Sequence, residues 1–126
     1  MKHIKKKFLI FAFFAVVPIA LAYGIYPDWF AFTLLGIETL DNNIAHILRA
    51  VMCLYLGLGL FWLYSAFNES YRNPALVTII VFTGSLVIGR LISLYADGQP
   101  APILILYIGL ELVLVPVAFW VLRMPE

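Results

Sequence analysis

The stretch ALVTIIVFTGSLVIGRLISLY, residues 75–95, is the part of the sequence that decides the fold. It is long and apolar, and Arg90 is its only charged residue. Because a membrane-spanning helix needs about 20 predominantly apolar residues, the stretch predicts a transmembrane helix. A charged side chain in such a helix is costly and usually faces the protein interior or a water-filled cavity. Residues 75–95 therefore predict a spanning helix and, at Arg90, a polar contact inside the protein.

The rest of the chain has the same character. Of its 126 residues, 64% are hydrophobic and only 12% are charged, whereas soluble proteins have about 25% charged residues. Four stretches are long and apolar enough to span a membrane: residues 8–26, 44–67, 75–95 and 103–122. The connections at residues 68–74 and 96–102 are short and polar, which makes neighbouring helices antiparallel. The sequence predicts an all-α fold in which residues 1–126 form one integral membrane four-helix bundle, antiparallel and up-down.

The first connection, residues 28–41, is longer and half apolar. It is too short to span, so we expect it to lie along the membrane interface as a short amphipathic helix or to re-enter the outer leaflet.

The basic residues outside the spans predict the orientation. They are Lys2, Lys5, Lys6 and Lys7 before the first span, Arg72 between the second and third, and Arg123 after the fourth. The opposite connections carry Asp28, Glu38, Asp41 and Asp97. By the positive-inside rule both termini are cytoplasmic, N-in/C-in, in a multi-pass protein of the cell inner membrane. The expected aromatic anchors are Tyr23, Tyr26, Trp29 and Tyr95 at the outer surface and Trp62, Tyr64 and Trp120 at the inner one.

The first span has an alternative interpretation as a signal peptide. Its basic start, its apolar core and the sequence Ala20-Leu21-Ala22 fit that pattern. Cleavage would leave three spans and a new N-terminus outside the cell.

Three charged residues lie inside the predicted spans: Arg49, Arg90 and Glu111. At a rise of 1.5 Å per residue, the arginines lie roughly 8 Å and the glutamate roughly 12 Å from the outer ends of their helices. We expect Arg90 to pair with Glu111. The partners open to Arg49 are Glu111, Asp97, Glu38 and Asp41. Two arginines against one deep carboxylate would leave positive charge, which suits a phosphate or carboxylate ligand.

Helical spacing extends this group of polar residues. Ser93 and Asp97 share a face with Arg90, and Tyr107 shares a face with Glu111. The candidate polar core or binding site consists of Arg49, Arg90, Glu111, Asp97, Ser93, Asn43 and Tyr107. On the second span, Arg49, Cys53 and Gly57 form a stripe that ends in small residues, which favours close approach of another helix. Cys53 is the only cysteine and is expected to be a packing residue.

Three stretches of the chain resemble a known family. They are NIAHILRAVMCLYLGLGLFWLYSA at residues 43–66, GRLISLYADGQP at residues 89–100 and ELVL at residues 111–114. They resemble an uncharacterised family of small bacterial membrane proteins, catalogued as domain of unknown function 4345. The positions that carry the resemblance are Asn43, Arg49, Tyr55, Gly57, Gly59, Gly89, Arg90, Ser93, Asp97, Gly98, Pro100 and Glu111. The stretch AVMCLY departs from the family pattern, which has a glycine before the tyrosine.

The resemblance covers about residues 24–115 and implies four membrane helices, without assigning an activity. Three functions stay open from the sequence. In the first, an outer-leaflet pocket binds a lipid headgroup or small anion. In the second, the protein is a structural or accessory subunit of a membrane complex, and the charges only fix helix packing. The third and weakest is a membrane enzyme acting on a lipid or quinone.

The expected partners follow from these alternatives. They are membrane lipids, an anionic lipid or small-molecule ligand, and a membrane protein or a second copy of the chain. Neither a nucleic acid nor a cofactor is expected. One cysteine and two separated histidines, His3 and His46, make a zinc site an unfavourable interpretation.

Overall fold

The computed structural model describes residues 3–125, so Lys2 lies outside the described part. The fold is all-α. Its long helices are α1 (Ile4–Gly24), α3 (Asn42–Ala66), α4 (Glu69–Asp97) and α5 (Pro102–Arg123). A short helix α2 (Pro27–Phe30) and a π-helical turn η1 (Ala31–Leu35) lie between α1 and α3. Within the described residues, these four long helices have the length and apolar composition needed to cross a membrane.

Each predicted span corresponds to one long helix, but α4 is longer than its predicted span. The sequence NESYRNP was expected to be a turn, whereas α4 already begins at Glu69 and contains Pro74. Only Phe67 and Asn68 connect α3 to α4. A carboxylate in the first turn is favourable near the helix N-terminus, which explains an early start at Glu69.

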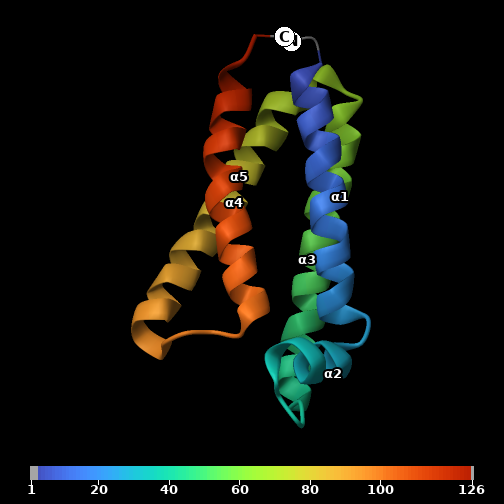
Figure 1. Cartoon of the computed structure of the whole chain (residues 1–126). Helices are drawn as coiled ribbons and strands as arrows, with labels where there is room; N and C mark the ends of the chain where they lie inside the picture. Colours follow the sequence, from blue (N-terminus) through green and yellow to red (C-terminus); the bar gives the residue numbers. More distant parts are fainter. Residues whose placement is uncertain (1–2, 126) are drawn as a thin grey trace.

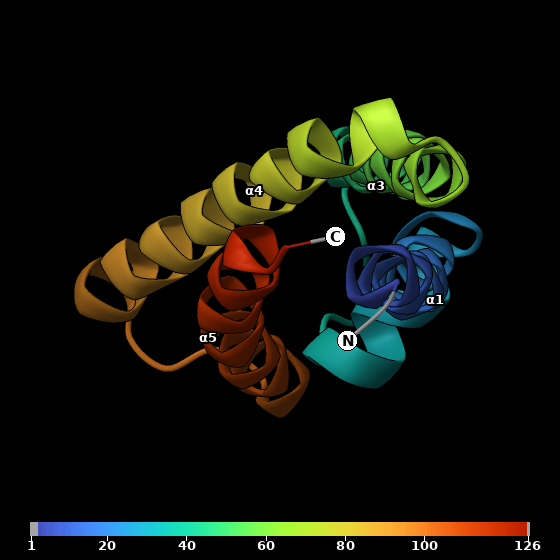
Figure 2. The same cartoon turned by 90° about the horizontal axis from the view of Figure 1, so that it is seen from above.

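The long helices form two pairs, α1 with α3 and α4 with α5, as Figures 1 and 2 show. Each long helix runs opposite to the one before it, so α1 begins and α5 ends at the same end of the molecule (Figure 1). Glycine allows the close approach in the first pair. A Cβ on Gly59 would lie 2.9 Å from Val16 Cγ1, and a Cβ on Gly24 would overlap Met52. The predicted close approach of another helix at Gly57 is wrong, because no heavy atom of the described residues lies within 4 Å of a Cβ placed there.

The two pairs meet at the end where α3 turns into α4. Arg72 is buried there and donates from Nε and Nη2 to the carbonyl oxygen of Ala66, at 3.1 and 2.8 Å. Lys5 Nζ donates to Asn73 Oδ1 at 2.7 Å and thereby joins α1 to α4. Trp62 Nε1 donates to Thr78 Oγ1 at 3.0 Å and joins α3 to α4. We call this the closed end of the molecule.

Toward the other end, α4 moves away from α3, whereas the start of α5 stays in contact with α1 and η1 (Figures 1 and 2). Exposure of the inner face of α4 increases in the same direction. Four residues on this face recur every seven positions: Leu76, Thr83, Arg90 and Asp97. Leu76 is 0% exposed and Thr83 is 2% exposed. Arg90 is partly exposed and Asp97 is exposed. The interior therefore opens progressively toward the α4–α5 loop, which we call the open end.

The segment after α1 folds over the open end of the α1–α3 pair. Phe30 and Ala31 are buried, and the Phe30 ring lies 4.8 Å from the Tyr23 ring. Gly36 ends the turn with a φ of 75°, a left-handed conformation that glycine adopts without strain. The segment thus consists of a short helix, a π-helical turn and an irregular stretch. Its predicted position at a membrane interface stays a prediction.

Candidate functional site

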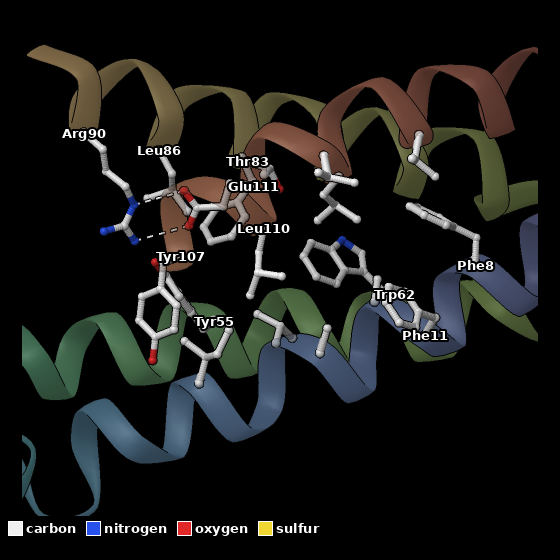
Figure 3. A pocket seen from close by; sticks show the side chains of 18 residues that line it. Phe8, Phe11, Tyr55, Trp62, Thr83, Leu86, Arg90, Tyr107, Leu110 and Glu111 are labelled. Atoms are coloured by element: carbon white, nitrogen blue, oxygen red, sulfur yellow. Dashed lines mark hydrogen bonds and ion pairs between the residues drawn. The ribbon is translucent and has the colours of Figure 1, made fainter. Parts of the chain in front are cut away.

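The central polar feature is a two-pronged ion pair between α4 and α5. Arg90 Nε donates to Glu111 Oε2 at 3.0 Å, and Arg90 Nη2 donates to Glu111 Oε1 at 3.2 Å. The side chains are 18% and 15% exposed, respectively. Such two-pronged arginine–carboxylate pairs are stronger and more directional than single charged hydrogen bonds. The predicted pairing of Arg90 with Glu111 is confirmed, and Figure 3 shows it at one end of a cavity.

Three tyrosines surround this ion pair. The Arg90 guanidinium lies over the Tyr107 ring, 5.7 Å from its centroid. The Tyr23 ring contacts the rings of Tyr107 and Tyr55 with centroids 6.1 and 5.8 Å apart, and its hydroxyl interacts with Arg90. Because Tyr23 belongs to α1 and Tyr55 to α3, all four long helices contribute to the site.

An apolar cavity of about 420 Å³ begins at the ion pair. Four helices line it, and its far end is formed by Phe8 and Phe11 of α1 and Trp62 of α3 (Figure 3). Arg90 and Glu111 are the charged residues in its lining. From Phe8 to Ile19 the cavity follows α1 for about 16 Å at 1.5 Å per residue. We call this space the chain cavity.

A second cavity of about 480 Å³ lies on the side of Arg90 that faces the α4–α5 loop. It is more polar, and its lining includes Arg90, Ser93 and Asp97. Ser93 Oγ donates to Asp97 Oδ2 at 2.7 Å. Arg90, Tyr55 and Leu86 line both cavities, so the guanidinium stands between them. We call this second space the head cavity.

Two of the predicted site residues lie elsewhere. Arg49 is exposed and makes no ion pair with the residues that the structure describes. Asn43 is exposed in the first turn of α3, where its backbone N–H donates to Asp41 Oδ1 at 3.2 Å. The predicted cluster of three buried charges is therefore reduced to one ion pair, because Arg49 has the right depth but faces away from the other helices.

Two aromatic residues were assigned to the membrane surfaces and are instead buried. Tyr23 is 7% exposed and belongs to the site, while Trp62 is 2% exposed and hydrogen-bonded to Thr78. Tyr26, Trp29, Tyr64, Tyr95 and Trp120 are exposed. The sequence around Tyr23 does not distinguish a tyrosine at the membrane interface from a buried tyrosine that forms hydrogen bonds, since both occur near helix ends.

The described residues contain no group of three or more His, Cys, Asp or Glu side chains that could hold a metal ion. Cys53 is a free, exposed thiol. The site presents a guanidinium, two carboxylates and the hydroxyls of tyrosine and serine.

Four long apolar helices around one internal ion pair define a small multi-span membrane protein. The chain belongs to the family described as "Domain of unknown function (DUF4345)", whose model matches residues 4–122. Comparison with curated proteins and with solved structures finds no match.

Proposed function

We propose that this is an inner-membrane protein that binds an amphiphilic molecule from the bilayer. The polar head of the ligand lies in the head cavity beside Arg90, and its apolar chain lies in the chain cavity. The observation that carries the proposal is the position of the ion pair, which separates an apolar cavity from a more polar one.

The size of the chain cavity supports a ligand. The chain cavity is open along one side, because Phe11, Leu110 and Val113 in its lining are exposed. The chain cavity, at about 420 Å³, has the size of small-molecule sites, which are roughly 300–1,000 Å³ and mostly apolar with a few placed polar groups. A pair that only fixed the packing of α4 against α5 would need no such space beside it.

Arg90 keeps the capacity to bind a headgroup. An arginine side chain has about five N–H donors. In Arg90, two of them donate to Glu111, and the Tyr23 hydroxyl interacts with the same guanidinium. The remaining donors suit an oxygen of a phosphate or carboxylate group. Since Arg49 does not join the site, its positive charge adds nothing, and a free small anion is less well supported than the headgroup of a lipid.

The arrangement of charges supports the proposed orientation. Lys5 and Arg72 lie near the starts of α1 and α4, and Arg123 ends α5. Figure 1 shows these helix ends together at the closed end, whereas the end of α4, which carries Asp97, is at the open end. By the positive-inside rule the closed end, with both termini, faces the cytoplasm. The head cavity then opens in the outer leaflet, where lipid heads point outward and chains point inward, as in the proposed binding mode.

Native mass spectrometry of the protein purified in mild detergent tests the proposal. Ala15 lines the chain cavity and is exposed, so Ala15→Phe would fill the space without disturbing the packed core. Ala50 is exposed on α3 and lies outside both cavities, which makes Ala50→Phe the matched control. We expect a co-purifying amphiphile on the wild type and on Ala50→Phe, and its loss on Ala15→Phe. Equal retention by both variants would contradict the proposal.

A second candidate is an accessory subunit of a membrane complex. The observation in its favour is that the ion pair is complete in itself, and the described residues contain no buried side-chain polar atom without a hydrogen bond. The same measurement separates the two candidates. A retained protein subunit without any small molecule would support the accessory role.

A further inference from the structure

The head cavity has two regions of opposite charge. At its inner side, Arg90 offers its remaining N–H donors beside Glu111. At its outer side, the Asp97 carboxylate ends α4, where the helix dipole adds negative potential. Among the residues that the structure describes, no lysine lines this cavity, and Arg90 is the only arginine that does. A single anion would therefore use Arg90 and leave Asp97 without a role.

The two regions are arranged in order along one helix face. Asp97 follows Arg90 by seven residues, which places them on the same face and about 10 Å apart along the axis. The chain cavity begins on the other side of Arg90. Moving outward, a ligand meets the apolar cavity, then the guanidinium, and then the carboxylate. The matching molecule has an apolar chain, then an anionic group, and then a cationic tip.

We infer that the ligand is a zwitterionic lipid with a primary ammonium group, its phosphate beside Arg90 and its ammonium beside Asp97. This inference rests on the proposed function. Asp97 accepts one hydrogen bond from Ser93, and an ionised carboxylate has room for about three more. A primary ammonium supplies three N–H donors, whereas a quaternary ammonium supplies none.

The experiment is lipid competition on the full chain. The protein in detergent is mixed with equal amounts of phosphatidylethanolamine and phosphatidylglycerol that carry the same two oleoyl chains, and native mass spectrometry counts the bound lipids. We expect the wild type to prefer phosphatidylethanolamine roughly threefold, the size typical of an exposed ion pair. Phosphatidylcholine with the same chains should bind less than phosphatidylethanolamine.

Variants at Asp97 test the assigned contact. Asp97→Asn should remove the preference while phosphatidylglycerol still binds, and Asp97→Glu should retain the preference. Asp28→Asn, at an exposed carboxylate outside both cavities, is the matched control and should behave as the wild type. Equal binding of the two lipids by the wild type, or a preference unchanged in Asp97→Asn, would overturn the inference.

The same measurement separates this inference from the proposed function. If Ala15→Phe abolishes binding of both lipids while the wild type shows no preference, the amphiphile site stands and the ammonium assignment fails. If Ala15→Phe leaves the binding of both lipids unchanged, the proposed function fails as well.

Discussion

At the scale of single residues, Arg90 and Arg49 show what depth in a helix can and cannot predict. Both lie at a similar depth in the sequence, yet only Arg90 faces a carboxylate. Thr83 is buried and lies seven residues before Arg90, on the same face of α4. On α3, Tyr55 marks the buried face, and Arg49 lies about 120° around the helix from it at 3.6 residues per turn. The sequence could not separate the two cases, because each arginine lies in a long apolar run and has a polar residue three positions away, His46 for Arg49 and Ser93 for Arg90.

The energy of the ion pair is testable by a double-mutant cycle. Removing one partner of a fully buried pair costs about 3–5 kcal/mol because the other charge is left unpaired. With 18% and 15% of the side chains exposed, the loss for Glu111→Gln should be smaller but still above about 1 kcal/mol. Arg90→Leu combined with Glu111→Leu should recover much of it, since apolar replacement of a whole pair is often neutral. Unfolding of the detergent-solubilised variants gives the free energies.

Glu38→Gln is the control for this cycle, because Glu38 is exposed and makes no ion pair within the described part of the chain. It should change the free energy of unfolding by less than about 0.5 kcal/mol. Strictly additive effects at Arg90 and Glu111 would show that the two side chains do not interact.

Cys53 should be replaceable. Its thiol is free and exposed, with no disulfide partner in a chain that has one cysteine. Cys53→Ala is expected to change the free energy of unfolding by less than about 0.5 kcal/mol, as for most exposed positions. Retained lipid should be unchanged in the native mass spectrum. Loss of the bound lipid in a folded Cys53→Ala variant would show that the thiol belongs to the site.

At the scale of helices, the sequence predicted the four long elements but not how they pair. Uninterrupted apolar length and polar turns were enough for the helices themselves. The pairing of α1 with α3 depends on where the backbones approach closely, and Gly57 and Gly59 are indistinguishable by composition. In the structure, the close approach of α1 and α3 occurs at Gly59, where the absence of a side chain makes room for Val16. The early start of α4 was missed because Asn68 is typical of turns as well as of helix starts, and Pro74, which lies inside α4, is more typical of a turn.

The two glycines give a matched test of this packing. Gly59→Ala should destabilise the protein by about 1–2 kcal/mol, because overpacking costs more than the gain of up to about 1 kcal/mol in helix propensity. Gly57→Ala lies two residues away with open space around it, and it should be neutral or slightly stabilising. Thermal unfolding in one detergent compares the two. A more stable Gly59→Ala variant would mean that α1 and α3 do not approach closely there.

At the scale of the whole molecule, the two ends differ in construction. The closed end is held by Arg72 on Ala66, Lys5 on Asn73 and Trp62 on Thr78, each a contact between neighbouring helices or across their turn. The open end has the cavities and the exposed Asp97. Side chains near the closed end are thus fixed by hydrogen bonds, while the separation at the open end leaves space for a ligand. Sequence reasoning found the charges at both ends. It could not predict that α4 moves away from α3, because that depends on side-chain packing and not on the spacing of apolar residues.

The orientation of the molecule is testable by thiol labelling in intact cells. In a Cys53→Ala background, Ser70→Cys places a thiol just after the α3–α4 turn and Gln99→Cys places one in the α4–α5 loop, both at exposed positions. Because the closed end carries the basic residues, it should be cytoplasmic. A membrane-impermeant maleimide added from outside should label Gln99→Cys at once and Ser70→Cys only after the membrane is permeabilised. The opposite labelling pattern would show that the protein has the inverse orientation, with the head cavity in the inner leaflet. Equal labelling of both positions would mean that α4 does not cross the membrane.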